Sequence, residues 1–191
     1  MNIYIYIYIY RLAISYESKF VPLNKKEWKE FWLEDIVTIK SGVRLTKANQ
    51  IDGTIAFIGS TDSNNGITGF VSNNNKSLDS NVLGVNYNGS VVENFYHPYK
   101  GIFSDDVKRI HWKEKAEENK YTYLFLKQAI LQQKNKYAYG YKFNESRMNR
   151  QKILLPVIKF GDVDFDYMKK YMQVQEIKNQ YEILEYYYNL L

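Results

Sequence analysis

The sequence predicts an α+β protein in which a β-rich domain, about residues 26–157, is followed by a long helix within residues 158–191. Two observations support this prediction. Short β-like runs, separated by turns rich in Gly and Asn, fill the first part of the chain. After residues 161–162, apolar side chains recur every three or four positions, which is typical of a coiled-coil-like helix. At 191 residues the chain is long enough for one domain with its own core.

Residues 1–25 are interpreted as an N-terminal extension that begins MNIYIYIYIY. As protein, alternating Ile and Tyr predicts a strand that is apolar on both faces, or an edge that needs covering. The run is far shorter than the ~20 residues of a membrane span, and no signal-peptide pattern is evident. Because alternating A and T bases encode Ile and Tyr, our hypothesis is a translated dinucleotide repeat that carries no chemistry.

Two hairpins are expected in the β-rich part. Runs at 55–58 and 67–71 flank a polar loop of Ser, Thr, Asp and Asn, which predicts two strands and their connection. Residues 82–97 contain a pair of strands joined by Asn88-Gly89, the strongest short hairpin signal.

The later elements are predicted from periodicity. Residues 103–112 are a further strand, 119–136 have helical spacing without Pro or Gly, and 137–157 continue strand-like. A final helix covers about 162–190, and its N-terminus receives negative charge from Asp162, Asp164 and Asp166. An isolated helix of this length is marginal in water, so its apolar seam needs a partner inside or outside the chain. The seam residues are Val174, Ile177, Tyr181, Leu184, Tyr188 and Leu191.

Composition excludes several kinds of chemistry. The net charge of +5 and the pI of about 9.0 are compatible with a nucleic-acid partner. The absence of Cys excludes disulfides and thiol catalysis, and it suits a cytoplasmic protein. Both histidines, His97 and His111, are interpreted as packed or surface residues, and no nucleophile elbow or phosphate-binding glycine loop occurs. We therefore expect no catalytic residues, no cofactor and no metal.

Polar and basic loops mounted on β-structure remain as the candidate site. Arg and Lys bond guanine, Asn and Gln pair with the adenine edge, and both cations contact phosphate. We expect base contacts from Ser60, Thr61, Asn64, Asn65, Arg147, Asn149 and Arg150. We expect phosphate contacts from Arg44, Lys47, Lys142 and Lys152. The alternative is that the Asn-rich loops are ordinary turns and the basic run is a soluble strand edge.

Six segments in order, followed by the start of a helix, carry a resemblance. They are WLEDIVTIKSGVRLTK (32–47), AFIGSTDSNNGITGFV (56–71), NYNGSVVENFYHPY (86–99), FSDDVKRI (103–110), YTYLFLKQAI (121–130) and YGYKFNESRMNRQKILLPV (139–157), then GDVDFDYMKKYM (161–172). This order resembles the DNA-specificity subunits of type I restriction–modification systems, and the related specificity domains fused to type II enzymes.

The resemblance implies a target recognition domain that reads half of a bipartite duplex DNA site, and a spacer helix that docks methyltransferase subunits. Restriction subunits are further partners that it implies, and the catalysis belongs to those partners. A full specificity subunit has two recognition domains and two spacer helices. This chain has one of each, so it is a half-subunit that self-associates through its helix, a truncated product or a domain of a longer enzyme. The family usually has Gly after GSV, where this chain has Val92, which leaves the geometry of that turn open.

Two other functions are left open by the sequence. The first is a small metal-dependent nuclease that uses Asp105, Asp106 and Lys108. The second is a protein that interacts through its helix and has no affinity for DNA.

Overall fold

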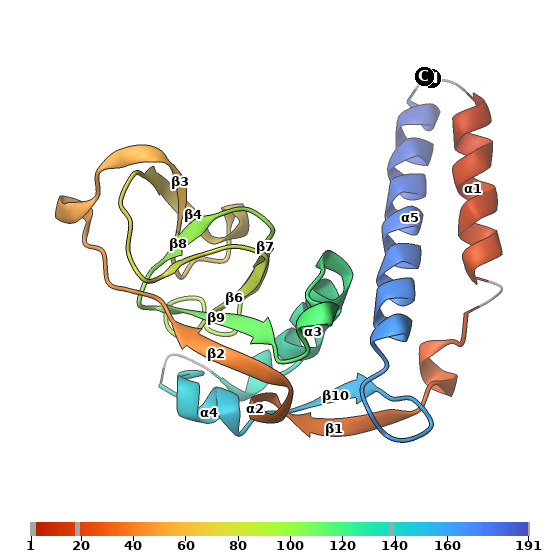
Figure 1. The fold of residues 1–191 in the computed structure, drawn as a ribbon. Coiled ribbons are helices and arrows are strands. Elements are labelled where there is room, and N and C mark those ends of the chain that lie inside the picture. The colour runs from red at the N-terminus through yellow and green to blue at the C-terminus, as the bar shows by residue number, and fades with distance from the viewer. Residues whose placement is uncertain (1–2, 18–19, 138–139, 191) are drawn as a thin grey trace. The chain divides into compact units, whose positions relative to one another are not determined.

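The computed structural model describes residues 3–17, 20–137 and 140–190, and the chain divides into two compact units. Residues 30–155 form one unit, which holds the two larger β-sheets (Figure 1). Residues 1–29 and 156–191 form the other, which holds the two longest helices. A two-stranded sheet pairs β1 (Trp28–Trp32) with β10 (Lys152–Pro156). Among the described residues, no helix combines the length and the hydrophobicity that a membrane span requires.

The 30–155 unit contains an antiparallel sheet in the order β2-β9-β6-β7, which we call the central sheet. Its strands are β2 (Val37–Ser41), β6 (Val82–Asn86), β7 (Asn94–His97) and β9 (Val107–Trp112), and the short helix α2 (Leu33–Ile36) precedes β2. Every residue of β6 and β9 is buried. Helix α3 (Lys120–Leu131) packs against β7 and β6, where the rings of Tyr96 and Tyr123 stack at 5.4 Å.

The second sheet is mixed, with the order β4-β3-β8-β5. Its strands are β3 (Asp52–Ile58), β4 (Ile67–Val71), β5 (Leu78–Asp79) and β8 (Gly101–Phe103). β3 is antiparallel to β4 and parallel to β8. Ala56 and Ile58 pack with Phe103 in one apolar cluster, whereas Phe57 packs with Ile102 in another. Strand β3 therefore buries both of its faces, as a near-continuous apolar run predicts.

Both predicted hairpins are confirmed, as β3–β4 and β6–β7. In the second hairpin, Gly89 has φ +60°, the left-handed conformation that Gly adopts readily. Val92 also has a positive φ, +71°, although its side chain is fully buried. This conformation is a genuine outlier for a β-branched residue. It is held by hydrogen bonds in which the Val92 amide donates to Asn86 at 2.9 Å and the Asn94 side chain donates to the Val92 carbonyl at 3.0 Å.

The two predicted helices are present. Helix α3 begins after Asn119, whose side chain accepts from two backbone amides in a capping box, and a separate 3₁₀ turn follows at Lys134–Lys136. The long final helix is α5 (Phe165–Asn189). Asp164 caps it by accepting from the Tyr167 amide at 2.9 Å, as the predicted role of the aspartates requires.

Two predictions of local structure are wrong. The Ile/Tyr tract forms helix α1 (Ile3–Glu17) rather than a strand. Alternating apolar residues leave every side of a helix apolar, so the pattern did not exclude a helix that packs against another one. The stretch 137–157 is not continuous strand either, because helix α4 (Glu145–Asn149) interrupts it before β10. Asn144 caps α4 by accepting from the Arg147 amide, a local signal that the strand interpretation overlooked.

Helices α1 and α5 lie side by side in their unit (Figure 1). The rings of Tyr10 and Tyr181 are 5.1 Å apart. Along the predicted seam, Val174 is buried, Ile177, Tyr181 and Leu184 are partly buried, and Tyr188 is exposed. Leu191 lies outside the described residues. The α5 seam therefore has a partner within the chain along much of its length.

Candidate nucleic-acid interface

The loop that joins β3 to β4 holds the first two predicted base-contact residues. The Ser60 hydroxyl donates a hydrogen bond to the Asn88 carbonyl, and the Asn86 side chain donates to the Thr61 carbonyl at 2.9 Å. Both partners belong to the end of β6 or to the turn that follows it. These bonds hold the loop against the β6–β7 turn, so the two chain segments form one surface.

Asn64 and Asn65 form the tip of this loop. Both have left-handed backbone conformations, with φ +51° and +52°, which Asn tolerates better than most residues. Both residues are exposed. An amide can donate to one base atom and accept from another, so the tip presents the groups that pair with an adenine edge.

Two predicted phosphate ligands lie in the connection from β2 to β3. The Arg44 side chain is 77% exposed and lies 3.6 Å from the Asp105 carboxylate. Lys47 is also exposed and donates to the Gln50 side chain at 3.4 Å. The exposed ion pair of Arg44 contributes little to stability, and the partner of Lys47 is neutral, so both cations are available to a polyanion.

Arg147, on α4, has a fixed guanidinium group. Its central carbon lies 3.7 Å from the centroid of the Tyr141 ring, and one of its nitrogens donates to the Lys142 carbonyl at 2.6 Å. Tyr141 is 52% exposed. Because five N–H groups project from a guanidinium, donors remain for a ligand after this bond is made. The Lys142 side chain is partly buried.

Glu145 connects α4 to the central sheet. Its carboxylate accepts from the Lys108 ammonium at 2.9 Å and from the Ser41 hydroxyl at 3.3 Å. The bond from Lys108 holds the pKa of Glu145 below its ordinary value. Lys108 is nearly buried and also lies over the Tyr87 ring, 5.2 Å from its centroid. This ion pair places α4 beside the ends of β2 and β9.

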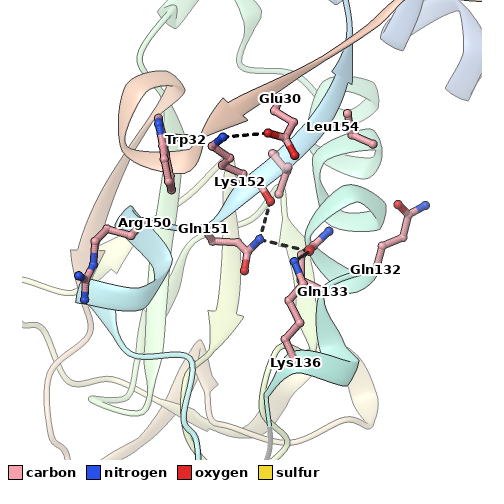
Figure 2. Close-up of a pocket in the computed structure, with 10 residues that line it drawn as sticks. Glu30, Trp32, Gln132, Gln133, Lys136, Arg150, Gln151, Lys152 and Leu154 are labelled. Carbon is pink, nitrogen blue, oxygen red and sulfur yellow. Dashed lines mark hydrogen bonds and ion pairs between the residues drawn. The ribbon is translucent and has the colours of Figure 1, made fainter.

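The remaining predicted residues follow α4. Asn149 is partly buried at the last position of the helix. Arg150 donates to the backbone and the hydroxyl of Ser146. Lys152 pairs with Glu30 at 2.9 Å. Arg150 and Lys152 line a polar pocket of about 440 Å³, together with Trp32, Gln133, Lys136 and Gln151 (Figure 2).

The structure places part of the predicted set at one end of the sheet formed by β2, β9, β6 and β7, and another part at the pocket. Ser60 and Thr61 meet the β6–β7 turn, and the ion pair of Glu145 brings α4 to neighbouring strands of the same sheet. Arg150 and Lys152 belong to the pocket instead. Sequence reasoning did not single out Trp32, Gln133 or Lys136 as site residues. Residues 30–32, 132–136 and 150–154 are far apart in sequence and carry no shared motif, so no local signal identifies the pocket.

Both histidines are packed within the fold. His97 is fully buried, and this burial lowers the pKa of its imidazole to about 4. Its ring lies edge-on to Phe103, with centroids 5.2 Å apart. His111 lies between two carboxylates, with Asp79 and Glu118 each 3.0 Å from one ring nitrogen. Arg109 reaches the same Asp79 oxygen at 2.9 Å, so this network ties β5 to β9.

Each residue of the alternative nuclease site interacts with another side chain. Asp106 accepts from the Asn88 side chain at 3.0 Å, Asp105 faces Arg44, and Lys108 is paired with Glu145. Within residues 3–17, 20–137 and 140–190, no group of three or more His, Asp or Glu side chains is placed to hold a metal ion.

Comparison with known proteins identifies the family. A family model, "Type I restriction modification DNA specificity domain", matches residues 25–185, so the chain belongs to this family. Among curated proteins, it is 59% identical over 156 residues to the specificity subunit S.BcgI of a type II restriction enzyme from Heyndrickxia coagulans. This match covers 82% of the chain and 46% of the relative.

Solved structures show the same fold. The S subunit of a type I restriction-modification system from M. genitalium superposes with a TM-score of 0.61 at 17% identity, covering 93% of this chain and 50% of that one. The HsdS subunit from Thermoanaerobacter tengcongensis gives a TM-score of 0.58 at 9% identity, with coverage of 94% and 46%. The chain therefore spans about half the length of the relatives it matches.

Proposed function

We propose that this chain is a sequence-specific DNA-binding half-subunit of a restriction–modification system, which directs a methyltransferase and endonuclease complex to its target. Family membership, the specificity role in the name of its 59% identical relative and the net charge of +5 support the proposal. Residues 26–157 would recognise duplex DNA, and residues 158–191 would form the spacer helix.

The fixed guanidinium of Arg147 is the observation that carries the proposal. A bidentate contact from Arg to guanine discriminates between bases by ~1–3 kcal/mol, provided that the fork is held in place. The Tyr141 ring and the Lys142 carbonyl hold it. Ser60, Thr61, Asn64, Asn65, Asn149 and Arg150 are the other proposed base contacts, and Arg44, Lys47, Lys142 and Lys152 the proposed phosphate contacts.

Selection of bound duplexes from a random library tests this proposal with the full chain, alone and with a cognate methyltransferase subunit. The selected site is then compared with a scrambled duplex for the wild type, Arg147→Lys and Lys47→Gln. Arg147→Lys should reduce the preference for the selected site by about ten-fold or more, because a bidentate contact is lost. Lys47→Gln should weaken both duplexes equally and reduce the salt dependence by about one phosphate contact.

Two results would contradict the proposal. The first is an unchanged preference in the Arg147→Lys protein. The second is binding of random duplex that barely changes with salt, which would favour a protein that interacts through its helix and does not bind DNA.

Docking of methyltransferase and restriction subunits, and self-association, are assigned in this proposal to α5. Two copies that pair symmetrically would recognise a symmetric, interrupted DNA target. Because α1 already packs along α5, pairing of two α5 seams would require α1 to move aside. Footprinting that finds a single uninterrupted, asymmetric site would contradict the dimer.

The chain itself is proposed to catalyse no reaction. The engagement of Asp106 by Asn88 and of Lys108 by Glu145 supports this view, because a nuclease needs such groups free for metal and substrate. Magnesium-dependent cleavage by the purified chain that Asp106→Ala abolishes would establish the alternative.

A further inference from the structure

Arg150 and Lys152 are proposed duplex DNA contacts, but the other residues that line the polar pocket of the 30–155 unit are not. The pocket lies where α3 ends, beside β1 and β10, and its volume of about 440 Å³ falls within the ~300–1,000 Å³ of typical small-molecule sites. Figure 2 shows Trp32 and Lys136 on opposite sides of Gln151. The pocket therefore has an aromatic ring with a basic side chain, Lys152, at one end, and a second basic side chain, Lys136, at the other.

Positive charge at the pocket is only partly compensated. The Lys136 ammonium donates to the Gln133 side chain at 2.7 Å, and Arg150 donates to Ser146. These acceptors are neutral, so they leave the two charges in place. Lys152, in contrast, has a carboxylate partner in Glu30. A group with more than one negative charge, such as a phosphate, would compensate these positive charges. Hydrogen bonds between charged groups are stronger than those between neutral groups.

Gln151 gives the pocket a buried, hydrogen-bonded polar side chain. Gln151 is only 6% exposed, and its amide oxygen accepts from the Tyr137 hydroxyl at 2.6 Å. Its amide nitrogen donates to the Gln133 side chain at 3.2 Å. Gln132 adds a further, exposed amide to the lining of the pocket. Fixed amides beside a cavity give hydrogen-bonding specificity to a ligand of defined shape.

Trp32 supplies a flat apolar surface. Its side chain lines the pocket and is 41% exposed, although the Lys152 ammonium lies 4.9 Å from the ring centroid. Stacking of a nucleic-acid base on an aromatic side chain contributes ~1–3 kcal/mol and tolerates any base. The combination of a ring, fixed amides and an uncompensated ammonium matches a ligand with a heterocycle at one end and a phosphate at the other.

We propose that this pocket binds a single unpaired nucleotide, with its phosphate at Lys136 and its base against Trp32. The ligand is either a free nucleotide or one unstacked from a DNA strand, since both offer the same chemistry. The inference does not depend on sequence-specific binding of duplex DNA by the Arg147 surface.

Titration of the full chain with deoxyadenosine monophosphate, monitored by calorimetry and by tryptophan fluorescence, tests the site. Lys136→Gln should weaken binding about ten-fold, because a charge-assisted hydrogen bond is lost. Lys134→Gln is the matched control, since this neighbouring lysine pairs with Glu93 and does not line the pocket. Trp32→Phe should retain binding better than Trp32→Leu, because only Phe keeps a ring.

Several results would overturn the proposal. They are an absence of binding by the folded wild-type chain, equal weakening by Lys136→Gln and Lys134→Gln, and equal affinity for inorganic phosphate or for deoxyadenosine without phosphate. Competition then identifies the source of the ligand. Displacement of the mononucleotide by single-stranded DNA but not by paired duplex supports a nucleotide within a strand, and displacement by neither supports a free nucleotide. Equal displacement by both DNAs would contradict the proposal, because the pocket would then bind backbone.

Discussion

Replacement of Val92 offers a direct measurement of strain in the β6–β7 turn. With φ +71°, this residue is in the left-handed region, which costs an L-residue roughly 1–2 kcal/mol that Gly does not incur. Val92→Ala removes two buried methyl groups but keeps the strain, whereas Val92→Gly removes one carbon more and relieves it. Val85 is an internal control, because it is also fully buried but lies in strand β6.

The expected magnitude is obtained by comparing the difference in stability between the Gly and Ala variants at Val92 with the same difference at Val85. At Val85, the Gly variant should be less stable than the Ala variant by roughly 1–2 kcal/mol, from one more buried carbon and the larger entropy of Gly in the unfolded chain. At Val92 the same terms operate, but relief of strain offsets roughly 1–2 kcal/mol of them. Val92→Gly should therefore be about as stable as Val92→Ala.

Urea denaturation followed by circular dichroism measures the free energy of unfolding of the four variants. The gap between Gly and Ala should be smaller at Val92 than at Val85 by about 1–2 kcal/mol. An equal gap at the two positions would show that the backbone of Val92 is not strained, and the reasoning would fail.

Three further predictions concern single side chains. Because burial lowers the pKa of His97 from 6.5 to about 4, the unfolded chain binds its proton first as the pH falls. The wild type should therefore lose stability between about pH 6.5 and pH 4, by up to roughly 3 kcal/mol from this group, and His97→Asn should show a correspondingly smaller loss in urea titrations at several pH values. Glu145→Gln should cost about 1–2 kcal/mol in urea denaturation, because Lys108 loses its carboxylate while Glu145 itself is half exposed; an unchanged midpoint would argue against the ion pair. Asn119→Ala should cost about 1 kcal/mol through loss of the α3 cap, whereas Asn119→Asp should be nearly neutral, and equal losses in both would contradict capping.

Local signals predicted much of the fold. The β6–β7 hairpin follows from Asn88-Gly89 between alternating runs, and α3 follows from its spacing and from the absence of Pro and Gly. Helix α1 was not predicted, because strict alternation of two apolar residue types suits a strand and does not exclude a helix. Which of the two forms is decided by packing against α5, and that packing is a tertiary effect.

The sequence predicts the chemistry of the candidate site, which stays a prediction, but it does not predict the geometry of the site. Arg, Lys and Asn in polar segments of the sequence predict a polyanion partner, and Arg147, which lies on helix α4, belongs to that set. The sequence does not show that Glu145 pairs with Lys108 across 37 residues. Nor does it show that Trp32 and Lys136 line one pocket. Such contacts arise only when the sheets are assembled.

The repeated Ile-Tyr pairs of α1 make its packing tolerant of changes in length. Each added pair would lengthen the helix by about 3 Å and rotate the residues beyond it by about 200°. A helix with one apolar stripe would lose its contact face after such a rotation. Because Ile or Tyr occupies every position of the tract, an insertion or deletion of whole pairs would still leave the tract itself with apolar side chains on the side that faces α5.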